Sequence, residues 1–220
     1  MKPDVPLAAL DRCFRANAFL EAVPLLGECY SAHPIGRVVY AVAMNASRLK
    51  QPLEVEVPLA EFGVGASHHG VAVWDWRART LRRTTVSDTL RCRLDWQEFA
   101  MHVVVPLTSR GLALIGDPAR WATAGDRRIA GIRETRDGIV FEALGPSEER
   151  VLLVAYAERA PRAVRTWTPG RARTLRADDV PPGPRSGPDE GWHHDAATGL
   201  LTLAVRLDDI GRLRVMLDAG

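Results

Sequence analysis

Apolar runs of strand length recur along this chain about once every ten residues, a spacing typical of antiparallel β-structure. The densest signal lies in residues 96–121, WQEFAMHVVVPLTSRGLALIGDPARW. There, residues 99–107 and 111–116 form two apolar runs, separated by the polar turn 108–110. We expect the two runs to pair as a hairpin that is covered on both faces and central in its domain.

The remaining apolar patterns follow the same spacing and leave few residues for helices. Further strands are predicted at residues 38–44, 53–57, 71–76, 80–86, 89–95, 128–133, 138–143, 151–157, 164–168, 200–207 and 212–217. The Asp137-Gly138 turn predicts a hairpin between the strands on either side of it. The last two strands are expected to close the chain as another hairpin. Since alternating β and α units would need helical spacers, the sequence predicts an all-β fold, an antiparallel β-sandwich.

With 220 residues, the chain is long enough for one large β-domain, or for a sandwich and a second, smaller β subdomain. We assign residues 1–120 to the sandwich core with an N-terminal lead-in segment. Residues 121–220 are expected to add strands that complete the sandwich or form a small second β domain. Within them, residues 180–188, VPPGPRSGP, predict an irregular loop.

Charge and cysteine content restrict the classes of function. The formal net charge is +2, from 29 basic and 27 acidic residues, so no electrostatic surplus favours nucleic acid. Cys13, Cys29 and Cys92 are irregularly spaced, as expected of reduced thiols in a cytosolic protein. The first residues lack the apolar core of a signal peptide, and no run approaches the ~20 apolar residues that cross a membrane. We therefore expect a cytoplasmic protein with no membrane or nucleic-acid partner.

Two stretches point to a known family. One consists of LDRCF at residues 10–14, an apolar stretch, and GRVVYAVAMN at residues 36–45. The other runs from VWDW at residues 73–76, through an Arg-rich turn and a strand pair, to PLTSRGLALIGDPARW at residues 106–121. Both resemble the C-terminal β-sandwich region of the raffinose synthase and alkaline α-galactosidase (seed imbibition protein) family of glycoside hydrolases. The resemblance covers residues 7–120 loosely and the rest by strand pattern.

The resemblance implies a role in carbohydrate metabolism without catalysis by this chain. That family is expected to hydrolyse or transfer α-galactosyl groups with two aspartates carried on a catalytic barrel, one as nucleophile and one as acid/base. No stretch of this chain matches those barrel motifs, so no catalytic residue is carried over. We expect the chain to stabilise or complete a catalytic barrel carried elsewhere, with an apolar surface left exposed on the isolated chain. The alternative is a stand-alone carbohydrate-binding β-sandwich module.

Tryptophan side chains are the candidate carbohydrate-binding residues. Trp74 and Trp76 lie two apart in one predicted strand and therefore on one face, and Trp192 follows the Pro/Gly loop. Exposed indole rings stack on sugar rings, whereas large aromatic side chains more often pack in the core. For Trp74 and Trp76 we favour the core, and all three residues stand as the carbohydrate-binding hypothesis.

Other reactive residue types occur without the pattern that their chemistry requires. His68-His69 and His193-His194 offer at most one convenient ligand per pair, so we expect no metal and no other cofactor. The serines lack a G-x-S-x-G motif, and the cysteines are expected to fill core space. Asp117 is expected to be a turn residue. A group of arginines predicts a salt-bridged surface: Arg79, Arg82, Arg83, Arg91 and Arg93.

Overall fold

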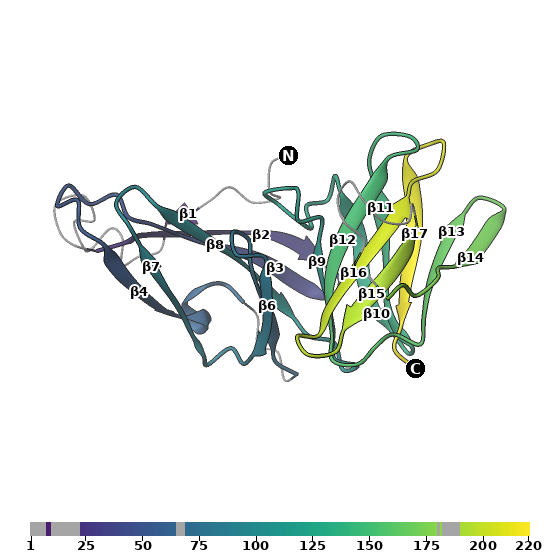
Figure 1. Ribbon diagram of the computed structural model, residues 1–220, viewed down its shortest axis with the longest axis horizontal. Helices are drawn as coiled ribbons and strands as arrows, with labels where there is room; N and C mark the ends of the chain where they lie inside the picture. The colour runs from purple at the N-terminus through teal and green to yellow at the C-terminus, as the bar shows by residue number, and fades with distance from the viewer. Residues whose placement is uncertain (1–7, 10–22, 65–68, 180, 182–189) are drawn as a thin grey trace.

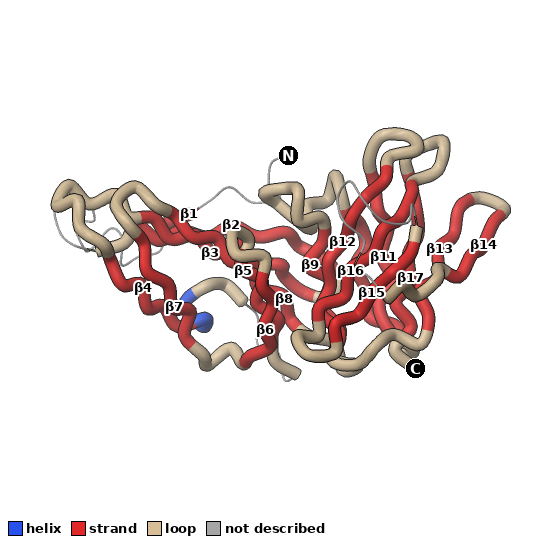
Figure 2. The backbone as a smooth tube through the Cα atoms, viewed as in Figure 1, coloured by secondary structure: helices blue, strands red, loops and turns tan. Residues whose placement is uncertain are grey.

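In this computed structural model the described residues are 8–9, 23–64, 69–179, 181 and 190–220. The strands are β1 (Ala8–Ala9), β2 (Leu25–His33), β3 (Gly36–Met44), β4 (Leu53–Pro58), β5 (Val71–Asp75), β6 (Thr80–Thr84), β7 (Thr89–Leu94), β8 (Phe99–Pro106), β9 (Leu112–Gly116), β10 (Ile129–Thr135), β11 (Gly138–Leu144), β12 (Arg150–Ala157), β13 (Ala163–Thr168), β14 (Arg171–Thr174), β15 (Gly191–Asp195), β16 (Leu200–Arg206) and β17 (Arg212–Asp218). Within the described residues, helix is confined to one 3-10 turn, η1 (Leu59–Glu61), as Figure 2 shows.

The strands of the described residues form four antiparallel sheets, which confirms the predicted all-β fold. A six-stranded sheet, β1-β2-β3-β8-β5-β6, and a two-stranded sheet, β4-β7, form one end. A five-stranded sheet, β10-β11-β17-β13-β14, and a four-stranded sheet, β15-β16-β12-β9, form the other end (Figure 1). The second pair of sheets begins with β9, so the chain crosses from one end to the other between β8 and β9. No helix in the described residues is long and apolar enough to cross a membrane.

The strands β3 and β8 are buried on both faces, as their continuous apolar runs predict. Val39 and Val104 face a smaller core that lies under the β4-β7 ribbon. Tyr40 and Val103 face the opposite side, in a larger core. In β4 the alternation of LEVEV appears as buried valines and exposed glutamates, because only one face of this ribbon is covered.

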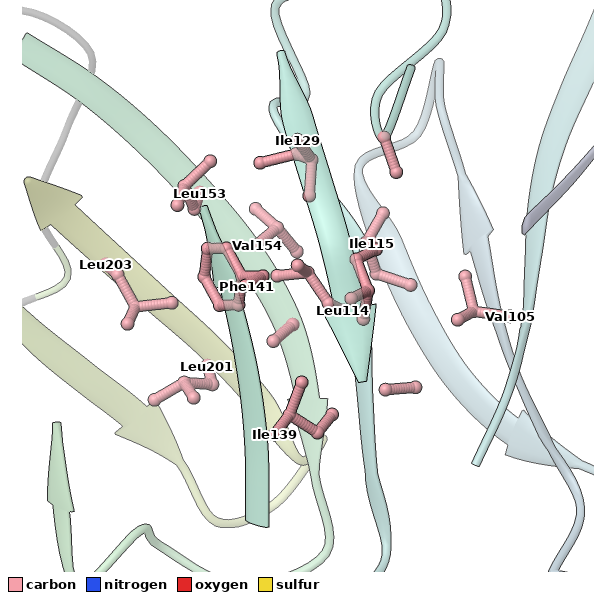
Figure 3. Packing of buried hydrophobic residues seen from close by; sticks show 14 of the residues in the cluster. Val105, Leu114, Ile115, Ile129, Ile139, Phe141, Leu153, Val154, Leu201 and Leu203 are labelled. Carbon is pink, nitrogen blue, oxygen red and sulfur yellow. The ribbon is translucent and has the colours of Figure 1, made fainter. Parts of the chain in front are cut away.

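The larger core is continuous from the six-stranded sheet into the second pair of sheets. Val105 at the end of β8 belongs to the same cluster as Leu114, Phe141 and Leu203 (Figure 3). The Tyr40 hydroxyl also accepts a hydrogen bond from the backbone amide of Ala124, at 3.1 Å. The two ends of the molecule therefore share one interior.

The two apolar runs at the centre of the sequence do not form the predicted hairpin. β8 pairs with β3 and β5, whereas β9 pairs with β12 in another sheet. The prediction that the last two strands form a hairpin is also wrong. β16 pairs with β12 and β15, whereas β17 pairs with β11 and β13. An apolar run reports that both faces of a strand are covered, but it does not identify the neighbouring strand.

The other strand predictions are largely confirmed. The pairing of β10 with β11 across the Asp137-Gly138 turn is present. The strands that the sequence did not clearly predict are β1, β2, β14 and β15, of which β14 is exposed along its length. Of the predicted loop 180–188, only residue 181 lies within the described residues.

Candidate functional site

A group of large apolar side chains stays exposed where the six-stranded sheet extends beyond the second pair of sheets. Met44 ends β3 and Phe99 begins β8, and the two residues are directly opposite each other in the antiparallel pair. Their side chains therefore share one face of the sheet. Trp96 and Trp121 are each 41% exposed, compared with 37% for Phe99 and 36% for Met44. With the half-buried Trp76, these four residues form what we call the aromatic face.

Ring contacts hold the aromatic face together. The Trp121 ring centroid lies 5.6 Å from that of Phe99 and 5.5 Å from that of Trp76. The ring planes are inclined by 49° and 61°, in the tilted and edge-to-face arrangements that aromatic pairs favour. These contacts fasten the loop after β9 to the loop after β5. Because the rings are inclined to one another, the aromatic face is uneven and is not a flat platform.

An open groove of about 450 Å³ adjoins this face. It is lined by Met44, Ala46, Ser47, Arg48, Lys50, Trp96 and Gln97. The Lys50 ammonium lies 4.9 Å from the centroid of the Trp96 ring, within cation–π range. The buried Asn45 anchors the groove, because its side-chain amide donates to the carbonyls of Gln51 and Leu94, at 2.8 and 3.2 Å.

Of the three tryptophans considered for sugar binding, two lie in the interior. Trp74 is 3% exposed and packs in the larger core. Trp192 is 9% exposed, and its indole N–H donates to the Leu175 carbonyl at 3.3 Å. Only Trp76 joins the aromatic face. No local pattern singles out Trp96, Phe99 or Trp121, although all three lie in or near the apolar runs 99–107 and 111–116.

Asp117 takes part in a buried charge network in addition to its turn. It accepts a hydrogen bond from the Ala119 amide at 2.9 Å, as a turn residue does. It also accepts from Arg128 Nε at 2.7 Å, and Arg128 in turn binds the Glu149 carboxylate at 2.5 Å. Burial lowers the pKa of Arg128, but the hydrogen bonds to Glu149 and Asp117 outweigh it and raise the pKa overall.

Most of the arginines expected on the surface are paired, as predicted. Arg82 contacts Asp88 at 2.7 Å, Arg83 contacts Glu158 at 2.6 Å, and Arg91 contacts Glu56 at 3.1 Å. Arg93 approaches Glu54 at 3.9 Å. The remaining residue of the group, Arg79, has no side-chain partner among the described residues.

His193, His194, Cys29 and Cys92 occupy structural positions. Ring nitrogens of His193 and His194 bond to the backbone carbonyls of Asp178 and Ala157, each at 2.9 Å. Within the described residues, no group of three or more His, Cys, Asp and Glu side chains is placed to hold a metal ion. His68 and Cys13 lie outside those residues. Burial raises the pKa of both Cys29 and Cys92 to about 11, so their thiols are protonated at neutral pH.

Comparisons with known proteins give a distant likeness in fold. No known protein family and no curated protein matches this chain by sequence. Among solved structures, a GH31 dextranase from Flavobacterium johnsoniae, complexed with glucose, superimposes with a TM-score of 0.42 and 9% sequence identity. The superposition covers 81% of this chain and 26% of the dextranase, so the chain spans about a quarter of that enzyme's length.

Proposed function

We propose that this chain is a non-catalytic β-sandwich region that packs against the catalytic barrel of an α-galactosidase-like or raffinose-synthase-like glycoside hydrolase and stabilises it. The aromatic face is the observation that supports this proposal. The choice of partner rests on the family resemblance of residues 7–120.

The composition and relief of the aromatic face favour a protein partner. Interface cores are rich in Trp, Phe and Met and poor in Lys and Glu, and the aromatic face contains three Trp, one Phe and one Met. Its tilted rings leave gaps that side chains of another domain fill, whereas a sugar ring needs a flat surface. The described residues include six exposed large apolar side chains. Four of them belong to the end that holds the six-stranded sheet: Met44, Leu49, Trp96 and Phe99. A fifth, Trp121, comes from the loop after β9 and contacts Phe99.

Affinity capture with the full chain tests the proposal. We expect a glycoside hydrolase barrel, identified by mass spectrometry, to be recovered with the wild-type chain and lost with Trp121→Ser or Phe99→Ser. Ile210→Ser is the matched control, because Ile210 is an exposed apolar residue (64%) in the turn between β16 and β17, apart from the aromatic face. Recovery of the chain without a barrel, or equal recovery by all variants, would overturn the proposal.

The groove beside Trp96 favours a second candidate, a carbohydrate-binding module. Trp96 supplies an apolar wall, while Lys50 and Gln97 supply hydrogen-bonding groups. Of the tryptophans predicted for this role, Trp76 is the one that reaches the aromatic face. Calorimetric titration with galactosides is expected to show binding that Trp96→Ala abolishes. An absence of heat together with unchanged tryptophan fluorescence would exclude this candidate.

A further inference from the structure

A second cavity lies between the two ends of the molecule, beside the aromatic face. It has a volume of about 230 Å³ and is lined by Arg79, Asp117, Pro118, Ala119, Arg120, Arg128, Glu149, Arg150 and Leu152. Arg79 comes from the loop after β5, Arg120 from the loop after β9, and Glu149 from the start of β12. The contact between Trp76 and Trp121 fastens these two loops together, so it also fixes the approach of Arg79 and Arg120 to the cavity.

The carboxylates of this cavity already have donors. Asp117 Oδ1 accepts from the Ala119 amide, and Asp117 Oδ2 accepts from Arg128 Nε, at 2.9 and 2.7 Å. Glu149 Oε1 and Oε2 accept from the two terminal nitrogens of Arg128, at 3.0 and 2.5 Å. Arg128 is 3% exposed and Asp117 is 2% exposed, so this pair is desolvated and its geometry is fixed, whereas the Glu149 side chain is 26% exposed.

The guanidinium groups of Arg79 and Arg120, in contrast, have no hydrogen-bonding acceptor among the described residues. Four arginines and two carboxylates line it, which gives a formal charge of +2. Arg120 reaches the carboxylates of Asp117 and Glu149 only at 3.7 and 3.8 Å, beyond hydrogen-bonding distance. Arg79 meets no acceptor among the described residues. Its backbone is in the left-handed region, with φ of 56°, a conformation that favours glycine.

We propose that this cavity binds a small oxyanion, a carboxylate or phosphate group, through the guanidinium groups of Arg79 and Arg120. Guanidinium presents parallel N–H donors that match the two oxygens of such a group. The network beneath holds Arg128 in place, and Arg128 donates to both Asp117 and Glu149. The cavity has room for the oxyanion with several waters, because a water molecule takes about 30 Å³ of liquid volume. Such an oxyanion occurs both in small metabolites and in acidic groups on a partner protein.

Calorimetric titration of the full chain with inorganic phosphate, and separately with acetate, tests this site. Ionic strength is held constant, so that screening does not imitate binding. We expect at least one of the two anions to bind, and Arg79→Gly to weaken that binding at least tenfold. Arg120→Gln is expected to act in the same direction. Arg91→Gln is the matched control, because Arg91 is an exposed arginine of β7 that pairs with Glu56.

The choice of Arg79→Gly separates binding from folding. Glycine suits the left-handed backbone of this position, so the variant is expected to be folded and its melting temperature is measured beside the titration. Binding of phosphate alone or acetate alone identifies the group that the site takes. No heat with either anion, or equal affinities for wild type and Arg79→Gly, would refute the proposal. Neither result depends on a barrel partner, so this test is independent of the proposed function.

Discussion

Two hairpin loops in this protein share a backbone hydrogen-bonding pattern but carry different residues at the left-handed position that ends each loop. In the loop between β5 and β6, Asp75 Oδ1 accepts from the amide two residues ahead, and in the loop between β15 and β16, Asp195 Oδ1 does the same, both at 2.9 Å. The backbone carbonyls of the two aspartates accept from the amides of Arg79 and Gly199, at 2.9 and 2.8 Å. Both of these final residues are left-handed, with φ of 56° and 71°. One loop therefore places arginine where the other places glycine.

Gly199 is required by packing, whereas the local backbone geometry does not favour an arginine at position 79. A Cβ atom at Gly199 would lie 2.5 Å from Cε2 of Tyr156, so that position admits only glycine. A side chain at a left-handed position costs about 1 kcal/mol relative to glycine. The loop that carries Arg79 accepts this cost, and its side chain reaches the oxyanion cavity. Such a cost is consistent with the binding role proposed for the guanidinium group.

Replacing Gly199 by the arginine that the other loop carries at this position should have the largest effect on stability. We expect Gly199→Arg to lower the free energy of unfolding by about 3 kcal/mol, because the left-handed strain adds to the overlap with Tyr156. Urea denaturation measures the loss. Gly170→Arg is the matched control, since Gly170 is also left-handed, with φ of 80°, but has no neighbour within 4 Å of a built Cβ. Equal losses in the two variants would show that the contact with Tyr156 does not matter.

The aspartates that begin the two loops, Asp75 and Asp195, should also differ in how much they contribute to stability. We expect Asp75→Ala to lower the free energy of unfolding by about 1–2 kcal/mol, because it removes acceptors for two loop amides and for the buried His102. Asp195 is bound within its own loop by Ala197 and Thr198, so Asp195→Ala should have a smaller effect. Thermal and urea denaturation of both variants measure the difference. A larger loss at Asp195 would contradict the role given to His102.

The reverse exchange in the first loop should stabilise the protein. We expect Arg79→Gly to raise the free energy of unfolding by about 0.5–1 kcal/mol in the absence of oxyanions, because it relieves the left-handed strain. The gain is partial, since glycine also increases the entropy of the unfolded chain. Arg79→Ala keeps the strain and removes the guanidinium group, so it serves as the control and should not be stabilised. If Arg79→Gly were destabilised, the arginine side chain would be making a structural contact.

Two further turns show why strands could be predicted and their partners could not. The backbone amide of Thr108 donates to the carbonyl of Leu112 at 2.8 Å, and that of Asp208 donates to Arg212 at 3.1 Å. The side chains of Thr108 and Asp208 accept from the same two residues, at 3.1 and 2.7 Å. In sequence each turn resembles a hairpin between two apolar runs. In the structure each one carries the chain from one sheet to another, because pairing is decided by contacts far apart in the sequence.

The candidate sites depended even more on distant contacts. Trp74 and Trp76 point to the same side of the sheet, yet Trp74 is buried and Trp76 reaches the aromatic face, according to how far the second pair of sheets extends. Trp96 and Trp121 are exposed for the same reason, which no local pattern reveals. The oxyanion cavity is assembled from three separated segments, and of its arginines the sequence pattern singled out only Arg79, as a surface charge.

The smallest expected difference between the two hairpin loops is in how they contribute to the loss of stability at acidic pH. The pKa of Asp75 is lowered, first by its interaction with His102, and the pKa of Asp195 is lowered, first by the Thr198 hydroxyl. A carboxyl group whose folded-state pKa lies below its unfolded value of about 3.9 stabilises the protein above that pH. The stabilisation is lost as the pH falls through the folded-state pKa. We expect the free energy of unfolding to decrease from about pH 5 to about pH 3, and both Asp75→Asn and Asp195→Asn to flatten this decrease.

The two variants distinguish the loops by how much they flatten the profile. Urea denaturation across the pH range gives the slope for each protein, and Asp95→Asn supplies an exposed aspartate for comparison. Asp75→Asn should reduce the slope more than Asp195→Asn, because its carboxylate is partly buried and faces a buried histidine, whereas Asp195 is bound by residues of its own exposed loop. Equal slopes for wild type and Asp75→Asn would mean that the bonds of Asp75 are as strong with the protonated acid. The response to acid would then not distinguish the two loops.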